Sequence, residues 1–397
     1  MDKLKIGIFC DAYYPQIDGV ISVVDNYATR LTELDCDVTV FAPESRKHNY
    51  VDDKIYKVVR CKTFKLPFLE YDLPTPKKDK AFMKYIAEHD FDIIHLHSPF
   101  SLGKLSSQIA NKRKIPSIIT MHSQFKRDFL RQTHSRIITK CMLDTIMKVF
   151  NRVDYAWAVN KDVAEVFKGY GYKGEPIIVH NATDMLPVED VDAARLLINE
   201  KHNIDDDTEF FLYVGRINIV KNLKFLLNAI KLYKNYGRKF KLVLIGSGQD
   251  YKIITKYANK LKLNDVVEFT GAIYDKKLIA KYYSRADLFC FPSLYDCSSI
   301  VQIEAASQHT PTVFLRNAVT ASTVTDNVNG YFADNSPEAF SEKLNEIMTD
   351  KVKLKKISDN AFNDIYITWD KLMVKVLEEY KRIIEEYKIK HTVNTVK

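Results

Sequence analysis

The feature that most constrains the fold is a series of short, continuous apolar runs that alternates with amphipathic segments. Runs rich in Ile and Val, separated by helical segments, predict parallel strands that are buried on both faces, because crossover helices cover both sides of such a sheet. The predicted strands are 5–10, 37–43, 55–61, 92–98, 116–123, 155–160, 176–181, 210–216, 241–248, 266–272, 288–293 and 310–315.

A polar segment over about 184–208 interrupts this alternation and is interpreted as a connection between two domains. The 397 residues suffice for two domains of ordinary size. We therefore predict two doubly wound α/β domains, over 1–184 and 185–369, followed by a long charged helix over about 370–390. Parallel sheets bind ligands outside the carboxyl ends of their strands, so a site is expected in the cleft between the domains.

Composition narrows the class of protein. Apolar residues make up 46% and charged residues 28%, as in soluble globular proteins. No apolar run approaches the roughly 20 residues of a membrane span, and we expect no secretory signal. The six cysteines show no C-x-x-C spacing, so neither a metal site nor a disulfide framework is expected, and a cytoplasmic location fits best.

The net charge of +8 is unevenly spread. Between residues 104 and 152, eleven Lys and Arg residues stand against two Asp residues. Such a stretch can be a solvated face, a patch for anionic lipid headgroups or a surface for nucleic acid. The absence of any nucleic-acid-binding motif disfavours nucleic acid.

Two stretches of the second half place charged groups after predicted strands. In VGRINIVKN, Arg216 closes a strand and Lys221 begins the next helix, a combination that suits a diphosphate. In LYDCSSIVQIEAAS, a helix beginning near Ser298 would offer the backbone N–H groups of Ser299, Ile300 and Val301 to an anion, with Asp296 and Glu304 able to bind sugar hydroxyls. The alternatives are a surface Arg and Lys, a helix N-cap at Asp296 or Ser298, and an exposed Glu304.

Two further candidates lie in the first half. His122 follows the strand in IITMHSQF, where a structural hydrogen-bonding role is the alternative. Gly19, in the loop after the first strand, would let the backbone approach a ligand closely. The loop lacks the G-x-G-x-x-G pattern, so a nicotinamide dinucleotide site has little support.

Taken in order, these stretches resemble the retaining nucleotide-sugar glycosyltransferases of family 4, which have the GT-B fold. The resemblance spans nearly the whole chain and is carried by KIGIFCDAYYPQIDGV, DIIHLHSPFSLG, PSIITMHSQF, YVGRINIVKN and FCFPSLYDCSSIVQIEAAS. It implies two Rossmann-like domains facing across a cleft. The first would bind the acceptor, the second would bind the donor, and the final helix would cross back onto the first.

The resemblance also implies roles for the candidates. Arg216 and Lys221 would bind the donor diphosphate and stabilise the leaving charge. Asp296 would hold hydroxyls of the transferred sugar, and the turn of Ser298, Ser299 and Ile300 would cradle sugar and phosphate. Glu304 would bind the ribose, the loop of Gly19 would approach the phosphate, and His122 would contact the sugar near its reacting carbon. No metal or other cofactor is expected, because the cationic side chains and the helix end take the place of the metal.

The sequence thus predicts a retaining hexosyltransferase that uses a nucleotide diphosphate sugar, with UDP favoured. The predicted acceptor is a lipid or lipid-linked glycan at the cytoplasmic face of the membrane, with residues 104–152 as a possible contact to anionic lipid. One alternative, motivated by the unusual turn Cys297-Ser298-Ser299, is a non-catalytic protein of the same fold that binds a nucleotide sugar or a partner enzyme. Another is an epimerase or hydrolase.

Overall fold

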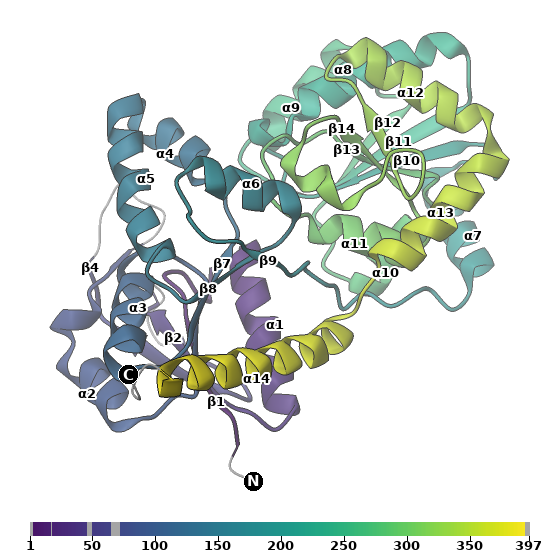
Figure 1. The fold of residues 1–397 in the computed structure, drawn as a ribbon. Helices are drawn as coiled ribbons and strands as arrows, with labels where there is room; N and C mark the ends of the chain where they lie inside the picture. Colours follow the sequence, from purple (N-terminus) through teal and green to yellow (C-terminus); the bar gives the residue numbers. More distant parts are fainter. Residues whose placement is uncertain (1–2, 17, 46–49, 65–71, 394–397) are drawn as a thin grey trace. The chain divides into compact units, whose positions relative to one another are not determined.

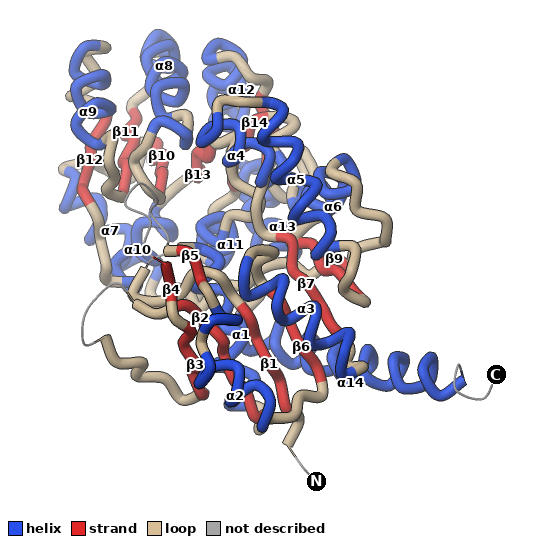
Figure 2. Tube along the Cα trace, turned by 90° about the vertical axis from the view of Figure 1, so that its left-hand side faces the viewer, coloured by secondary structure: helices blue, strands red, loops and turns tan. Residues whose placement is uncertain are grey.

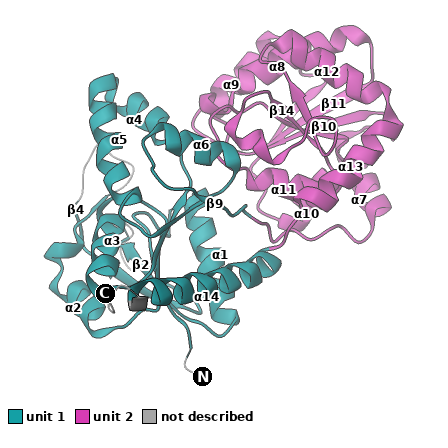
Figure 3. Ribbon diagram, in the orientation of Figure 1, with its two compact units in different colours: residues 1–181, 369–397 teal, residues 182–368 magenta. Residues whose placement is uncertain are grey.

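The computed structural model describes residues 3–16, 18–45, 50–64 and 72–393, and the chain divides into two compact units (Figures 1 and 3). Unit 1 comprises residues 1–181 and 369–397, and unit 2 comprises residues 182–368. Each unit has its own parallel sheet with helices packed on it. The predicted fold class of two Rossmann-like α/β domains is confirmed.

Unit 1 contains a seven-stranded parallel sheet in the order β3-β2-β1-β6-β7-β8-β9. The side chains of Ile6, Ile8 and Phe9 in β1 are completely buried, as expected for a strand covered on both faces. The strands are β1 (Lys5–Phe9), β2 (Asp37–Pro43), β3 (Lys57–Cys61), β6 (Ile93–Leu96), β7 (Ser117–Met121), β8 (Tyr155–Ala158) and β9 (Ile177–Ile178), with a separate antiparallel pair, β4 (Thr63–Phe64) and β5 (Leu73–Pro74). The helices are α1 (Gly19–Glu33), α2 (Lys80–Glu88), α3 (Ser101–Arg113), α4 (Phe125–Thr133), α5 (Arg136–Phe150), α6 (Lys161–Gly169) and α14 (Trp369–Val393).

The last helix, α14, belongs to unit 1 although more than 180 residues of unit 2 precede it, so its predicted return to the N-terminal domain is confirmed (Figure 1). It packs along α1. Its Tyr380 hydroxyl lies 2.5 Å from Nδ1 of the buried His95 in β6, and the Tyr380 ring stacks on Trp157 of β8 at 5.5 Å. These contacts join the end of the chain to the centre of the unit 1 sheet.

Unit 2 contains a six-stranded parallel sheet in the order β12-β11-β10-β13-β14-β15, whose strands are drawn in red in Figure 2. The strands are β10 (Glu209–Val214), β11 (Phe240–Ile245), β12 (Val267–Gly271), β13 (Leu288–Phe291), β14 (Thr312–Leu315) and β15 (Tyr331–Ala333). The helices are α7 (Val191–His202), α8 (Leu223–Tyr233), α9 (Tyr251–Lys260), α10 (Lys276–Arg285), α11 (Ile300–Ser307), α12 (Pro337–Thr349) and α13 (Lys351–Ile365).

The prediction of a polar connection over 184–208 was wrong for its central part, which forms α7. Polar residues of this helix are buried and have partners inside unit 2. His202 hydrogen-bonds to Glu268 and Tyr282, each at 3.0 Å, and Asn199 accepts a hydrogen bond of 2.6 Å from Arg285. These partners allow a polar segment to be part of the domain.

In both sheets the strand order reverses beside the first strand. β1 lies between β2 and β6, and β10 lies between β11 and β13. At such a reversal, the loops that follow two neighbouring strands lead to opposite faces of the sheet. A crevice for ligands therefore opens at the carboxyl ends of these two strands. The loops after β1, β6, β10 and β13 are therefore the expected ligand-binding loops of the two units.

Candidate functional site

In unit 2, the loops after β10 and β13 meet through the side chains of Lys221 and Asp296. The Lys221 ammonium forms an ion pair with a carboxylate oxygen of Asp296, and the two side chains are only 11% and 19% exposed. The Asn222 side chain adds a hydrogen bond of 3.2 Å to the Pro292 carbonyl. The structure thus brings together two of the predicted donor-site residues, at the reversal point of the unit 2 sheet.

Arg216 is exposed, and its backbone is held by the loops around it. Its carbonyl accepts a hydrogen bond of 3.1 Å from the Tyr213 hydroxyl, and the next residue, Ile217, donates to the Ser247 carbonyl at 2.9 Å. A Cβ atom on Gly246 would lie 1.9 Å from the Gly215 carbonyl oxygen, so only glycine allows the loops after β10 and β11 to pack this closely. Sequence reasoning missed Gly246, although its place in LIGSG after a strand was a usable signal.

The helix that was expected to begin near Ser298 begins at Ile300, with Ser299 as its N-cap. The preceding residues, 296–299, are not helical. Ile300 and Val301 are the first helical residues, and the N–H of the N-cap Ser299 also lies outside the helical hydrogen-bond ladder, so the predicted role of these three N–H groups stays a prediction. The Ser299 hydroxyl is buried and has no hydrogen-bond partner among the described residues.

Glu304 lies on α11 and is half-buried, so the alternative of a fully exposed helix residue does not hold. The Tyr283 hydroxyl donates a hydrogen bond of 3.3 Å to its carboxylate. Burial raises the pKa of Glu304, while the Tyr283 hydrogen bond and the Lys276 ammonium act against this rise. The carboxylate is thus held in one place with acceptor capacity remaining.

In unit 1, His122 follows β7 and pairs with a second histidine that follows the neighbouring strand β6. Nε2 of His122 lies 3.0 Å from Nδ1 of His97, and the two ring planes are inclined by 20° with their centroids 5.2 Å apart. Burial lowers the pKa of His122 to about 3 and lowers the pKa values of His95 and His97 well below their usual range. All three imidazoles are therefore neutral at neutral pH. Sequence reasoning missed His97, although it follows a strand in the same way as His122.

Gly19 is the first residue of α1, and Asp18 caps this helix by accepting a hydrogen bond of 2.8 Å from the Val20 N–H. A Cβ atom at Gly19 would meet no atom within 4 Å. The fold itself therefore does not require glycine there, and the predicted approach of a ligand stays a prediction.

A third residue that sequence reasoning missed is the buried Asp11, two residues after the end of β1. Its carboxylate accepts hydrogen bonds from the Ser98 hydroxyl at 2.7 Å and from the N–H groups of Phe100 and Leu102 at 3.1 and 2.7 Å. These bonds join the loop after β1 to the start of α3. The signal in the sequence was a carboxylate at the end of the first strand.

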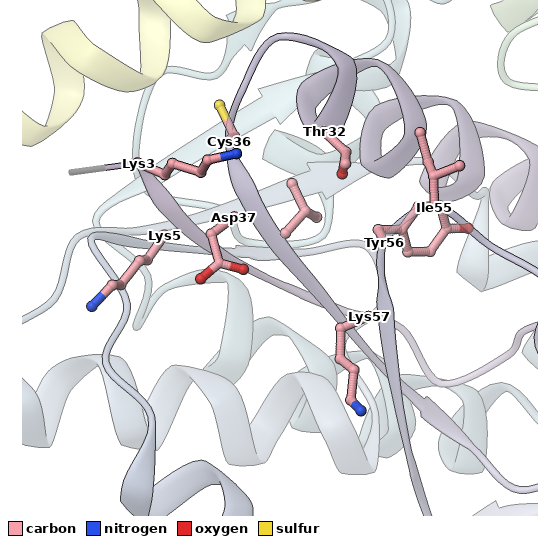
Figure 4. Close-up of a pocket in the computed structure, with 9 residues that line it drawn as sticks. Lys3, Lys5, Thr32, Cys36, Asp37, Ile55, Tyr56 and Lys57 are labelled. Atoms are coloured by element: carbon pink, nitrogen blue, oxygen red, sulfur yellow. The ribbon is translucent and has the colours of Figure 1, made fainter. Parts of the chain in front are cut away.

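A hollow of about 510 Å³ lies at the opposite edge of the unit 1 sheet, at the amino ends of β1, β2 and β3 (Figure 4). Three lysines, Lys3, Lys5 and Lys57, line it, and it shares no residue with the candidate site. Within the described part of the chain, no cluster of His, Cys, Asp and Glu is suited to hold a metal ion. In the same part, every helix is too short or too polar to span a bilayer.

Comparison with known proteins agrees with this arrangement. The family model of glycosyl transferases group 1 matches residues 195–364, and that of glycosyltransferase family 4 matches residues 17–185. An alpha-monoglucosyldiacylglycerol synthase of Acholeplasma laidlawii is 25% identical over 90% of this chain and 92% of its own length. The synthase of the same name from Streptococcus pneumoniae is 26% identical over 82% of this chain and 74% of its own length.

Solved structures match the fold. The sucrose-phosphate synthase of Thermosynechococcus elongatus has a TM-score of 0.77 at 18% identity, covering 97% of this chain and all of the other. Anabaena HepE in complex with UDP and glucose has a TM-score of 0.73 at 14% identity, covering 95% of this chain and 99% of the other. The family 4 model matches most of the N-terminal part of the chain, and the group 1 model matches most of the C-terminal part, so together they account for both units. The chain is a glycosyltransferase of the family 4 type with the GT-B fold.

Proposed function

We propose that this glycosyltransferase transfers a hexose, with retention of configuration, from UDP-hexose to a lipid or lipid-linked glycan at the cytoplasmic face of the membrane. The observation that carries the donor half of the proposal is the contact between Lys221 and Asp296 where the strand order of unit 2 reverses. It puts a cation and a carboxylate beside the start of α11, a place suited to a phosphate joined to a sugar.

Each group has a chemical task in this proposal. Arg216 and Lys221 neutralise the charge that grows on the diphosphate as its bond to the sugar breaks. Asp296 orients the Lys221 ammonium and accepts hydrogen bonds from sugar hydroxyls, while Glu304 holds the ribose. The acceptor oxygen forms the new bond to the sugar on the face that the diphosphate leaves, and the leaving phosphate takes the acceptor's proton. With two cations and a helix end in these roles, the transfer proceeds without a metal.

Relatives support the choice of substrates. Solved HepE structures contain UDP with glucose, or UDP-glucose, and two relatives of this chain are named as alpha-monoglucosyldiacylglycerol synthases. A glucosyl donor and a diacylglycerol-type acceptor are therefore the first substrates to test.

The surface of α4 and α5 supports a membrane contact. Ile137 and Ile138 are 78% and 51% exposed and adjoin the exposed basic residues Arg136 and Lys140. Apolar side chains next to basic ones suit the boundary between anionic headgroups and acyl chains. Within the basic stretch 104–152, the Arg113 side chain is held on α3 by hydrogen bonds to the carbonyls of Ile86 and His89, so this residue is not part of the proposed contact.

The transfer is tested with UDP-glucose and diacylglycerol in vesicles, in buffer with EDTA. We expect an α-linked glycolipid, identified by the anomeric coupling in proton NMR. Arg216→Ala and Lys221→Ala should each lower the rate by at least about 100-fold, whereas Lys234→Ala, which removes a surface ion pair with Asp265, should not. A β-linked product or a requirement for Mg²⁺ would contradict the mechanism. Free glucose formed without acceptor would identify a hydrolase, and UDP-glucose binding without turnover would identify a non-catalytic protein.

The membrane contact is tested by sedimentation with vesicles of anionic and of zwitterionic lipid. We expect binding to anionic vesicles that is lost when Ile137 and Ile138 are both replaced by Asp. Val352→Asp is the matched control, since Val352 is 84% exposed on α13. Equal sedimentation of the double variant and the control would remove α4 and α5 from the proposal.

A further inference from the structure

His97 and His122 leave neighbouring strands at the same edge of the unit 1 sheet. β6 and β7 are parallel neighbours, with Leu96 paired to Ile119, and each histidine follows its strand by one residue. The backbone N–H of His97 donates a hydrogen bond of 2.9 Å to the Phe9 carbonyl, which fixes the start of the loop. His97 is 3% exposed, whereas His122 is partly exposed. Of the two, His122 can reach a ligand, and His97 lies behind it.

The bond between the two rings constrains where their protons lie. Both imidazoles are neutral, so each has one N–H and one nitrogen that can only accept. The single contact joins Nδ1 of His97 to Nε2 of His122, and one of these two nitrogens must carry a proton. Two arrangements are possible, and they differ in whether the free Nδ1 of His122 is a donor or an acceptor.

The environment of His97 distinguishes between them. Its Nε2 is buried and has no hydrogen-bond partner among the residues that the structure describes. A buried N–H without an acceptor is rarer in native proteins than a buried acceptor that lacks a donor. The proton of His97 therefore belongs on Nδ1, from which it is donated to Nε2 of His122. His122 must then carry its own proton on Nδ1.

We propose that His97 is a positioning residue that holds His122 as the Nδ1–H tautomer and so presents an N–H donor to an oxygen of the bound sugar or acceptor. This role rests on the proposed function and on the contact of His122 with the transferred sugar that the family resemblance implies. Free neutral histidine prefers the opposite tautomer, so the arrangement has to be imposed by a partner such as His97. The two ring planes are inclined by 20° with their centroids 5.2 Å apart, so the hydrogen bond lies close to both ring planes and fixes the direction of the His122 donor.

The tautomer can be measured without any turnover. In the full-length protein labelled with ¹⁵N-histidine, the nitrogen shifts identify which ring nitrogen carries the proton, and the His122 signals are assigned by their loss in His122→Gln. We expect Nδ1–H for His122 in the unmodified protein and Nε2–H in His97→Leu. In His97→Asn, the side-chain amide can occupy the place of Nδ1–H, so we expect Nδ1–H at His122 to be kept. His122 with its proton on Nε2 in the unmodified protein, or unchanged in His97→Leu, would overturn the proposal.

The catalytic consequence is measured with UDP-glucose as donor. His97→Leu should lower kcat about tenfold, the change that corresponds to one hydrogen bond of about 1.4 kcal/mol, and leave KM for UDP-glucose nearly unchanged. His97→Asn should restore most of the rate. Equal losses of kcat in the two variants would show that His97 acts only through packing and would overturn the role in positioning. If the unmodified protein shows no turnover, the proposed function fails, while the NMR result still decides the tautomer.

Discussion

Replacing Gly246 by Ala should disrupt unit 2 at the point where the loop of Arg216 is held. The added Cβ would lie 1.9 Å from the Gly215 carbonyl oxygen, about 1.5 Å short of the 3.4 Å at which ordinary contact begins. The clashing atom is backbone, so the peptide of Gly215 has to move, and its hydrogen bond of 3.0 Å to Ile245 is strained. In addition, Gly246 has a φ of 148°, which alanine rarely adopts.

The expected cost combines these two effects. Forcing an atom into a packed site costs roughly 1–3 kcal/mol, and an unfavourable backbone conformation costs roughly another 1–3 kcal/mol. We therefore expect Gly246→Ala to lower the free energy of unfolding of unit 2 by roughly 2–6 kcal/mol. Because Arg216 follows Gly215 directly, the affinity for UDP should fall at least about tenfold in the same variant.

Both effects can be measured by urea denaturation followed by far-UV circular dichroism and by titration calorimetry with UDP. The two tryptophans, Trp157 and Trp369, lie in unit 1, so their fluorescence reports unfolding of that unit and separates it from unit 2. Gly237→Ala is the matched control, because its φ of 68° is also unfavourable for alanine while its Cβ would meet no atom within 4 Å. If Gly246→Ala destabilises the protein no more than Gly237→Ala and keeps its affinity for UDP, the argument from close packing of the two loops is refuted.

Three further predictions follow from other contacts. His95→Leu leaves the buried hydroxyls of Tyr380 and Thr120 without their partner and should destabilise unit 1 by roughly 2–4 kcal/mol. The tryptophan fluorescence transition should then occur at a lower urea concentration. Replacing the exposed His89 by Leu should have little effect. The free energy of unfolding of unit 1 should be greatest above pH 6.5 and should fall below that pH by about 1.4 kcal/mol per pH unit for each of His95 and His97. The reason is that histidines of the unfolded chain bind protons at a higher pH than these buried imidazoles do. A free energy of unfolding that stays constant between pH 6.5 and 4.5 would contradict their burial as neutral groups. Arg285→Met should lower the free energy of unfolding, measured by urea denaturation, by roughly 3–5 kcal/mol. The buried guanidinium binds Asn199 and the Thr208 carbonyl, and its loss leaves their oxygens unpaired. The surface variant Arg382→Met should lower it by under about 1 kcal/mol.

The sequence alone determined the elements and the places where chemistry can occur. Apolar runs and amphipathic segments are local patterns, so β2 was predicted with its observed bounds, and the final helix was predicted to begin near Trp369. The same local logic put Arg216, Asp296 and His122 at the carboxyl ends of strands. It failed for α7, because the buried polar residues Asn199 and His202 bind side chains of unit 2 that lie 66 or more positions further along the chain, namely Glu268, Tyr282 and Arg285.

Only the tertiary structure decided which of these residues meet. Lys221 and Asp296 are 75 positions apart and touch because β13 pairs with β10, a choice of neighbour that no local pattern encodes. His97 reaches His122 for the same reason, since β6 and β7 are adjacent. Strand order is set by long-range packing of whole elements, and for this reason the pairs within each unit could be named only after the fold was known.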